Sequence, residues 1–294
     1  MAAATMLSGP ARAGAASPSP SAPSTRAQRV GRAAIAALYD ELSLAPKPGL
    51  VSFDDAGSHA DMDAATFMRS LFSLRHYFVR VAMFGAAGAG FDVLQAEGIA
   101  AEARMLAATG GVNTHRGAVF TLGLLSAAAG LAGGPVAPPQ LRALLMATWG
   151  EALRARCGRA GPSHGQRAAQ AHGLQGAARE AALGFPAVFE LAWPALAAAR
   201  ASGLDRRRAH LQTLFEVIAA LDDTNLAHRG GLAGLRHAQA EARAFLRAGG
   251  AGRPDACVHA LAIHRGFVAR RLSPGGAADV LAAACLLERV GVAA

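Results

Sequence analysis

The chain has 294 residues, 52% of them hydrophobic, which is enough for one large or two small domains with a sizeable core. Its formal net charge of +9 is carried almost entirely by arginine, since Lys47 is the only lysine, and such a charge suits phosphate-bearing partners. Nucleic acid is disfavoured as a partner, because aromatic residues make up only 5% and most arginines are scattered.

Two features bear on the compartment. Residues 1–30 are rich in alanine, serine and proline and lack the charged start and apolar block of a secretory signal. We expect a disordered extension there, followed by one all-α domain over residues 31–294, although the composition also permits an organelle transit peptide. The cysteines Cys157, Cys257 and Cys285 have no metal-ligand or redox spacing, and we interpret them as free thiols of a cytoplasmic protein.

Apolar spacing predicts an all-α fold of about ten or more helices. Alanine is abundant, valine and isoleucine are scarce, and no strand alternation exceeds about four residues. In chain order we expect helices over residues 29–42, 64–84, 91–108, 118–131, 141–157, 167–183, 188–201, 206–221, 233–248 and 254–272, and a last helix that opens at Ser273. The glycine and proline residues at 133–139 could mark a subdomain boundary, but we expect one continuous core.

The stretch from Thr109 to Gly117 leads into residues 117–141, which contain no charged residue. We expect a buried central helix here, because only about 16 residues are solidly apolar, fewer than the ~20 needed to span a membrane. A helix N-terminus beside glycines and an arginine is suited to anions. The candidates that bind phosphate through close backbone approach, capping groups or charge are Gly110, Gly111, Asn113, Thr114 and Arg116.

Carboxylates gather in two loops next to helix ends. Asp54, Asp55, Asp61 and Asp63 lie within ten residues, and Asp222 with Asp223 forms a second group. Dense carboxylates repel one another unless they are solvated or bound to a cation, and aspartate with water and phosphate is the usual way to hold Mg²⁺. Helix capping is the alternative, above all for Asp63.

Four loops share glycine, a hydroxyl or amide, and a charge: residues 46–63, 109–117, 222–231 and 273–279. Helical proteins collect their sites where such helix ends converge. Three histidines in polar loops could act as acids or bases, or be structural: His59, His115 and His164. Three arginines could clamp phosphate: Arg116, Arg179 and Arg229; Arg179 could instead pair with its neighbour Glu180.

Seven motifs in this order carry a family resemblance. They are Pro-Lys-Pro-Gly-Leu-Val at 46–51, Gly-Ser-His with Asp-Met-Asp at 57–63, Thr-Gly-Gly-Val-Asn-Thr-His-Arg-Gly at 109–117, His-Gly at 164–165, Ala-Arg-Glu-Ala with Gly-Phe-Pro at 178–186, Asp-Thr-Asn with Arg-Gly-Gly at 223–231, and Ser-Pro-Gly-Gly with Asp at 273–279. Over about residues 33–290 the chain resembles the triphosphoribosyl-dephospho-coenzyme A synthases, which serve citrate lyase or malonate decarboxylase. A free-standing chain favours the malonate decarboxylase branch. Arg116 departs from the lysine of many relatives, and arginine and lysine bind phosphate differently.

The resemblance implies an all-α enzyme that joins the triphosphoribosyl group of ATP to 3'-dephospho-coenzyme A, with Mg²⁺ as cofactor and release of adenine. The product would pass to a carrier-protein holo-transferase. The implied catalytic residues are Asp61, Asp63, His59, His115 and Asp223. The implied metal ligands are Asp61, Asp63, Asp222, Asp223 and Asp279. The implied substrate ligands are Lys47, Gly110, Gly111, Asn113, Thr114, Arg116, Arg179, Asn225, Arg229, Ser273, Gly275 and Gly276.

Two other functions remain open at this point. All-α hydrolases of ADP-ribosyl bonds also place an Asp-Asp-Thr motif at paired Mg²⁺ ions, as residues 222–224 could here. A non-catalytic chain that binds a carrier subunit is the third possibility, although it would not need six carboxylates beside glycine loops.

Overall fold

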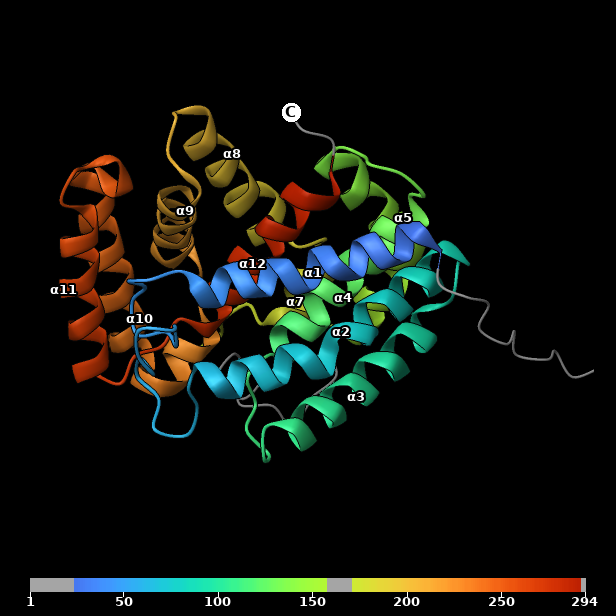
Figure 1. Cartoon of the computed structure of the whole chain (residues 1–294), viewed down its shortest axis with the longest axis horizontal. Coiled ribbons are helices and arrows are strands. Elements are labelled where there is room, and N and C mark those ends of the chain that lie inside the picture. The colour runs from blue at the N-terminus through green and yellow to red at the C-terminus, as the bar shows by residue number, and fades with distance from the viewer. Residues whose placement is uncertain (1–23, 158–170, 292–294) are drawn as a thin grey trace, which may run out of the picture.

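The structure is a computed structural model that describes residues 24–157 and 171–291. All regular elements of these residues are helical, which confirms the all-α prediction (Figure 1). They are α1 (Thr25–Ser43), α2 (Ala64–Ala86), α3 (Phe91–Ala108), α4 (Arg116–Leu131), α5 (Pro138–Arg156), α7 (Ala177–Ala182), the π-helical turn η1 (Ala187–Ala192), α8 (Trp193–Ala201), α9 (Arg206–Ala220), α10 (Thr224–Arg247), the 3-10 turn η2 (Gly250–Gly252), α11 (Ala256–Ala269) and α12 (Gly275–Val290). No helix among them is long and apolar enough to cross a membrane.

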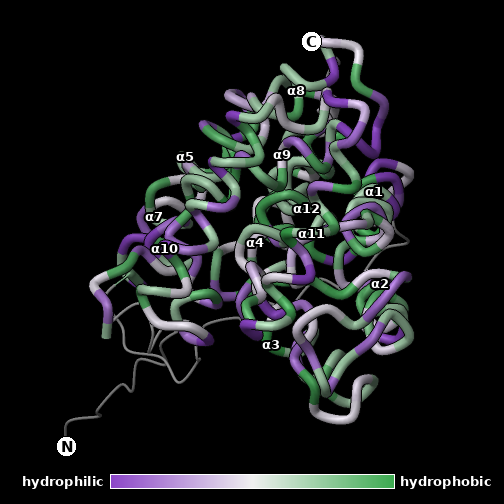
Figure 2. The backbone as a smooth tube through the Cα atoms, turned by 90° about the vertical axis from the view of Figure 1, so that its left-hand side faces the viewer, coloured by the Kyte–Doolittle hydropathy of each residue, from purple (hydrophilic) through white to green (hydrophobic). Residues whose placement is uncertain are grey.

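The predicted buried central helix is α4, in which 12 of 16 residues are buried. Helix α2 crosses it closely because small residues remove the steric barrier. A Cβ atom on Gly85 would lie 1.9 Å from the carbonyl oxygen of Ala127, and one on Gly130 would lie 2.0 Å from that of Ala82. Helix α12 shares the centre and packs against α1, α4 and α9 (Figures 1 and 2).

The hydrophobic core is continuous across the glycine- and proline-rich residues at 133–139. Buried side chains from α1 to α12 form one cluster, which includes Leu122 of α4, Leu145 of α5 and Leu286 of α12. The expectation of one core is therefore confirmed for the described residues.

Several helix boundaries differ from those predicted because side chains cap the first turns. Helix α1 begins at Thr25, since the Ser24 hydroxyl accepts a hydrogen bond from the Ala27 amide (3.1 Å); the predicted extension thus overlaps a helix, and residues 1–23 lie outside the described part. Helix α10 begins at Thr224 instead of residue 233, with a kink at Gly231. The predicted helix at 167–183 is described from residue 171, and there it is broken: residues 171–172 and α7 are helical, but residues 173–176 are not. His164 lies outside the described residues.

Candidate active site

Asp223 joins the first turns of two helices. Its buried carboxylate accepts hydrogen bonds from the amides of Asn225 (2.8 Å) and Leu226 (3.3 Å) at the start of α10, and from that of Ala277 (2.9 Å) at the start of α12. A Cβ atom on Gly276 would lie 3.0 Å from this carboxylate. The carboxylate and the two helix starts therefore hold one another in place, since helix N-termini favour anions.

Asp279 adds the start of a third helix. It lies in the first turns of α12 and accepts a hydrogen bond from the Ala118 amide in the first turn of α4. A Cβ atom on Gly117 would lie only 1.9 Å from its Oδ2 atom, so glycine leaves the room that this carboxylate occupies. The N-termini of α4, α10 and α12 thus meet at two carboxylates.

The surroundings of Asp223 and Asp279 destabilise their ionised forms. Burial raises the pKa of Asp223, against the lowering effect of its amide hydrogen bonds. Burial also raises the pKa of Asp279 well above its usual range, and the negative charges of Glu41 and Asp223 raise it further. A positive charge beside Asp223 and Asp279 would stabilise the ionised form of each carboxyl group.

Lys47 is a buried cation, only 1% exposed. Its Nζ atom donates to the carbonyl oxygen of Glu41 (2.6 Å) and to Glu41 Oε1 (2.5 Å). Burial lowers the pKa of Lys47 and the Glu41 carboxylate opposes that shift. Lys47, predicted as a phosphate ligand, therefore lies in an internal ion pair. The sequence prediction missed Glu41, whose only signal is an acidic residue on the buried face of α1.

His115 lies immediately before α4, and its buried ring contacts Ser70 of α2: the Ser70 hydroxyl lies 2.7 Å from His115 Nδ1. Its Nε2 atom is buried, as is the hydroxyl of neighbouring Thr114, and neither has a hydrogen-bond partner among the described residues. Unpartnered buried polar atoms are rare, so these two fit a site that binds a ligand.

A second pair of loops closes around His59. The Nε2 atom of His59 lies 2.9 Å from the Ser273 hydroxyl, and its buried Nδ1 atom lies 3.7 Å from Asp61 Oδ1. Burial lowers the pKa of His59, Arg229 lowers it further, and Asp61 opposes both. His59 is therefore neutral near pH 7 and able to accept a proton.

Backbone contacts join these loops. Arg229 donates through Nε to the carbonyl oxygen of Arg271 (2.7 Å) and also hydrogen-bonds the carbonyl oxygen of Ser58. The Ser58 hydroxyl donates to the carbonyl oxygen of Leu272 (2.6 Å). Arg271 has a φ of 55°, an uncommon conformation for a non-glycine residue that is typical of functional loops. Arg229, predicted to clamp phosphate, instead holds two loops together.

Several predicted residues lie apart from this cluster or serve as caps. Asn113 caps α4 by accepting from the Arg116 amide (3.1 Å), and the Arg116 side chain pairs with Glu102 of α3 (3.2 Å). Gly110 and Gly111 have positive φ angles and open space around them. Arg179 is exposed on α7, which packs on α5.

The predicted metal ligands do not form one preformed group. Asp63 caps α2 by accepting from the Thr66 amide (2.8 Å) and hydroxyl (2.7 Å), so the capping alternative holds for it. Asp61 and Asp222 are exposed. The described residues bring three potential metal-ligand atoms within 4.8 Å only at Asp40, His210 and Cys285, a different place in the fold. Asp223 and Asp279 remain as the close pair, while Asn225 and Gly275 contact each other beside them.

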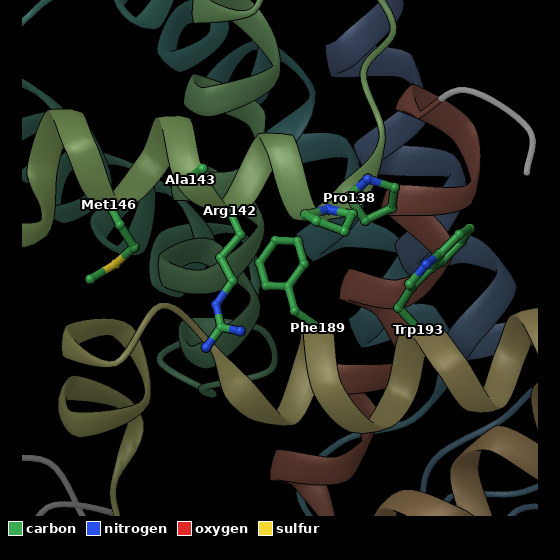
Figure 3. Close-up of a pocket in the computed structure, with 7 residues that line it drawn as sticks. Pro138, Arg142, Ala143, Met146, Phe189 and Trp193 are labelled. Carbon is green, nitrogen blue, oxygen red and sulfur yellow. The ribbon is translucent and has the colours of Figure 1, made fainter.

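A groove lies elsewhere in the fold. It holds about 410 Å³ between α5 and the η1–α8 segment and is lined by Pro138, Arg142, Phe189 and Trp193, among others (Figure 3). A smaller cavity of about 140 Å³ lies between α2, α3 and α4 and reaches Glu102. Neither is lined by Asp223, Asp279 or His59, so these residues are grouped here by their hydrogen bonds and charges.

The described fold is all-α, and the first turns of three of its helices meet at two buried carboxylates. Residues 27–294 match the family model CitG, described as ATP:dephospho-CoA triphosphoribosyl transferase. The chain is 40% identical over 270 residues to a protein of Acinetobacter calcoaceticus (91% of this chain, 92% of that protein), and 41% identical over 279 residues to one of Stutzerimonas stutzeri (91% and 93%). Both are named "Probable 2-(5''-triphosphoribosyl)-3'-dephosphocoenzyme-A synthase". The chain therefore belongs to the ATP:dephospho-CoA triphosphoribosyl transferase family. No solved structure matches it.

Proposed function

We propose that the chain transfers the 5-triphosphoribosyl group of ATP to the 2'-hydroxyl of 3'-dephospho-CoA and releases adenine. The bond between the ribose C1' and adenine breaks, a bond between C1' and the coenzyme oxygen forms, the hydroxyl proton leaves to a base, and adenine departs with a proton. The observation that carries this proposal is the convergence of Asp223 and Asp279 at three helix N-termini.

Asp279 and His59 each suit one requirement of this reaction. Positive charge develops at the sugar when the bond to adenine breaks, and a facing carboxylate stabilises it, as in glycoside hydrolysis. Asp279 suits that role, because it accepts fewer backbone hydrogen bonds than Asp223. His59 suits the role of base: it is neutral, its Nδ1 atom has no hydrogen-bond partner among the described residues, and Asp61 is close enough to stabilise the imidazolium.

Mg²⁺ would bind between the substrate phosphates and the carboxylates of Asp223 and Asp279. It is commonly bound through one or two carboxylates together with phosphate oxygens, and Asp223 and Asp279 provide such a pair. Bound there, the ion would neutralise charge on the triphosphate. The positive ends of the helix dipoles at these N-termini would contribute to phosphate binding.

The product, 2'-(5''-triphosphoribosyl)-3'-dephospho-CoA, would be the precursor of a prosthetic group that a holo-transferase attaches to an acyl-carrier subunit. We propose the malonate decarboxylase branch, and a cytoplasmic location with which the three free cysteines agree.

Purified protein incubated with ATP, Mg²⁺ and dephospho-CoA tests the reaction. Stoichiometric adenine without ADP supports the transferase, adenine release without coenzyme indicates a hydrolase, and no turnover indicates a binding protein. Asp279→Asn should reduce adenine release by at least about 100-fold, a typical cost of losing a group that stabilises the transition state. Asp92→Asn, at an exposed aspartate in the first turn of α3, is the matched control and should keep its rate. Equal rates in both variants would remove Asp279 from the reaction.

A further inference from the structure

His115 is held by two helices, its ring by α2 and its backbone by α3. Ser70 of α2 contacts Nδ1 at 2.7 Å, and Phe67 of the same helix packs edge-on against the ring, with centroids 4.8 Å apart and an angle of 71°. The backbone amide of His115 points to the sulfur of Met105 in α3 (3.3 Å). Ser70 is fully buried and His115 is 3% exposed, so water does not compete for these contacts.

The hydrogen-bond inventory defines the tautomer. Burial lowers the pKa of His115 to about 3, and the charge of Lys47 adds to this, so the ring carries one proton near pH 7. A serine hydroxyl has one hydrogen to donate. Within residues 24–157 and 171–291, the only partner of the Ser70 hydroxyl is His115 Nδ1. The hydroxyl therefore donates to Nδ1, which leaves the ring proton on Nε2.

That Nε2–H group has no acceptor in the described protein, although it is buried. An unsatisfied buried donor costs about 1–3 kcal/mol. It lies at the start of α4, where helix amides and Lys47 provide positive potential. The unpartnered hydroxyl of Thr114 lies in the same turn. This setting suits an anionic oxygen acceptor supplied from outside the chain.

We propose that Ser70 is a positioning residue that fixes His115 as the Nε2–H tautomer, and that Nε2 donates a hydrogen bond to a phosphate or ribose oxygen of the substrate. His115 thereby acts as a neutral donor and does not exchange a proton during turnover. The identity of the substrate rests on the proposed function, whereas the tautomer does not.

Nitrogen-15 NMR of the full chain with labelled histidine tests the tautomer without any turnover. Long-range proton–nitrogen spectra should show His115 with an unprotonated Nδ1 and a protonated Nε2, unchanged between pH 8 and pH 5. A cationic ring in this range, or a proton on Nδ1, overturns the proposal. Because this measurement needs no activity, it separates failure of this inference from failure of the proposed function.

Variants then test the role of Ser70. Ser70→Ala should convert the His115 spectrum to a mixture of tautomers and lower kcat for adenine release by about 10–100-fold, the usual effect of removing a group that orients a histidine. Ser126→Ala is the matched control: it removes another buried serine hydroxyl, on α4, that has no partner among the described residues, and should change neither readout.

Donor replacement completes the test. His115→Gln provides an amide donor near the position of Nε2 and should retain more activity than His115→Leu. If Ser70→Ala loses activity while the His115 tautomer stays unchanged, the serine is merely structural and the proposal fails. Wild-type spectra and rates in Ser70→Ala would also overturn it.

Discussion

Gly117→Ala tests the position of Asp279 without removing any functional group from the protein. The added Cβ atom would lie 1.9 Å from Asp279 Oδ2, whereas ordinary contact begins near 3.4 Å, so the carboxylate must move by about 1.5 Å. A misplacement of about 1 Å can reduce an enzymatic rate by about 100-fold. We therefore expect adenine release to fall by about two orders of magnitude.

The fold should tolerate this change. Helix propensity favours alanine over glycine by up to about 1 kcal/mol, while steric overlap costs about 1–3 kcal/mol. The free energy of unfolding, measured by urea denaturation, should thus fall by no more than about 2 kcal/mol. Gly266→Ala is the matched control, since this helical glycine has open space around it, and it should keep the rate. A folded Gly117→Ala enzyme with the wild-type rate would refute the placement of Asp279 in the site.

Two further predictions concern stability. Glu41→Gln removes the counter-charge of buried Lys47 and should lower the free energy of unfolding by about 3 kcal/mol or more. Its control, Glu97→Gln, breaks the surface pair with Arg80 and should cost less than about 1 kcal/mol by the same denaturation; similar losses would contradict the buried pair. Burial, then Arg206 and Arg200, lower the pKa of His210 from 6.5 to about 4, so the unfolded chain takes up the proton first. Stability from this residue is complete above pH 6.5 and falls by about 3 kcal/mol as the pH drops to 4. His210→Gln should remove that part of the slope in urea titrations at pH 7.5 and 4.5, and an unchanged slope would argue against a neutral buried ring.

Helix positions follow well from local sequence, because the signals lie within one turn of the boundary. The predicted helix at 91–108 coincides with α3, which starts after Gly90 and ends before Thr109. The start of α10 was misplaced, because Asp223 was interpreted as part of a loop that follows α9. Only its hydrogen bonds to Asn225 and Leu226 show that it caps the next helix.

The partners of the candidate site residues could not be predicted from the sequence. The density of carboxylates at 54–63 predicts a metal site. In the structure, however, the Asp63 carboxylate accepts a hydrogen bond from the Thr66 amide, and Asp55 lies 3.1 Å from His264. The sequence does not identify Glu41 and Ser70 as candidates, because a buried polar residue in an apolar helix has no distinctive sequence pattern. Their partners, Lys47 and His115, come from other elements.

The helical fold, the positions of most helices, the family resemblance and the loops with polar residues can all be predicted from local sequence. Caps, breakers and apolar spacing act over a few neighbouring residues, so they can be recognised without coordinates. Which loops meet cannot be predicted in this way. That choice depends on how closely helices approach, as at Gly85 and Gly130, and on which helix starts share a carboxylate. Asp223 and Asp279 influence each other because the packing of α4, α10 and α12 brings three helix N-termini together.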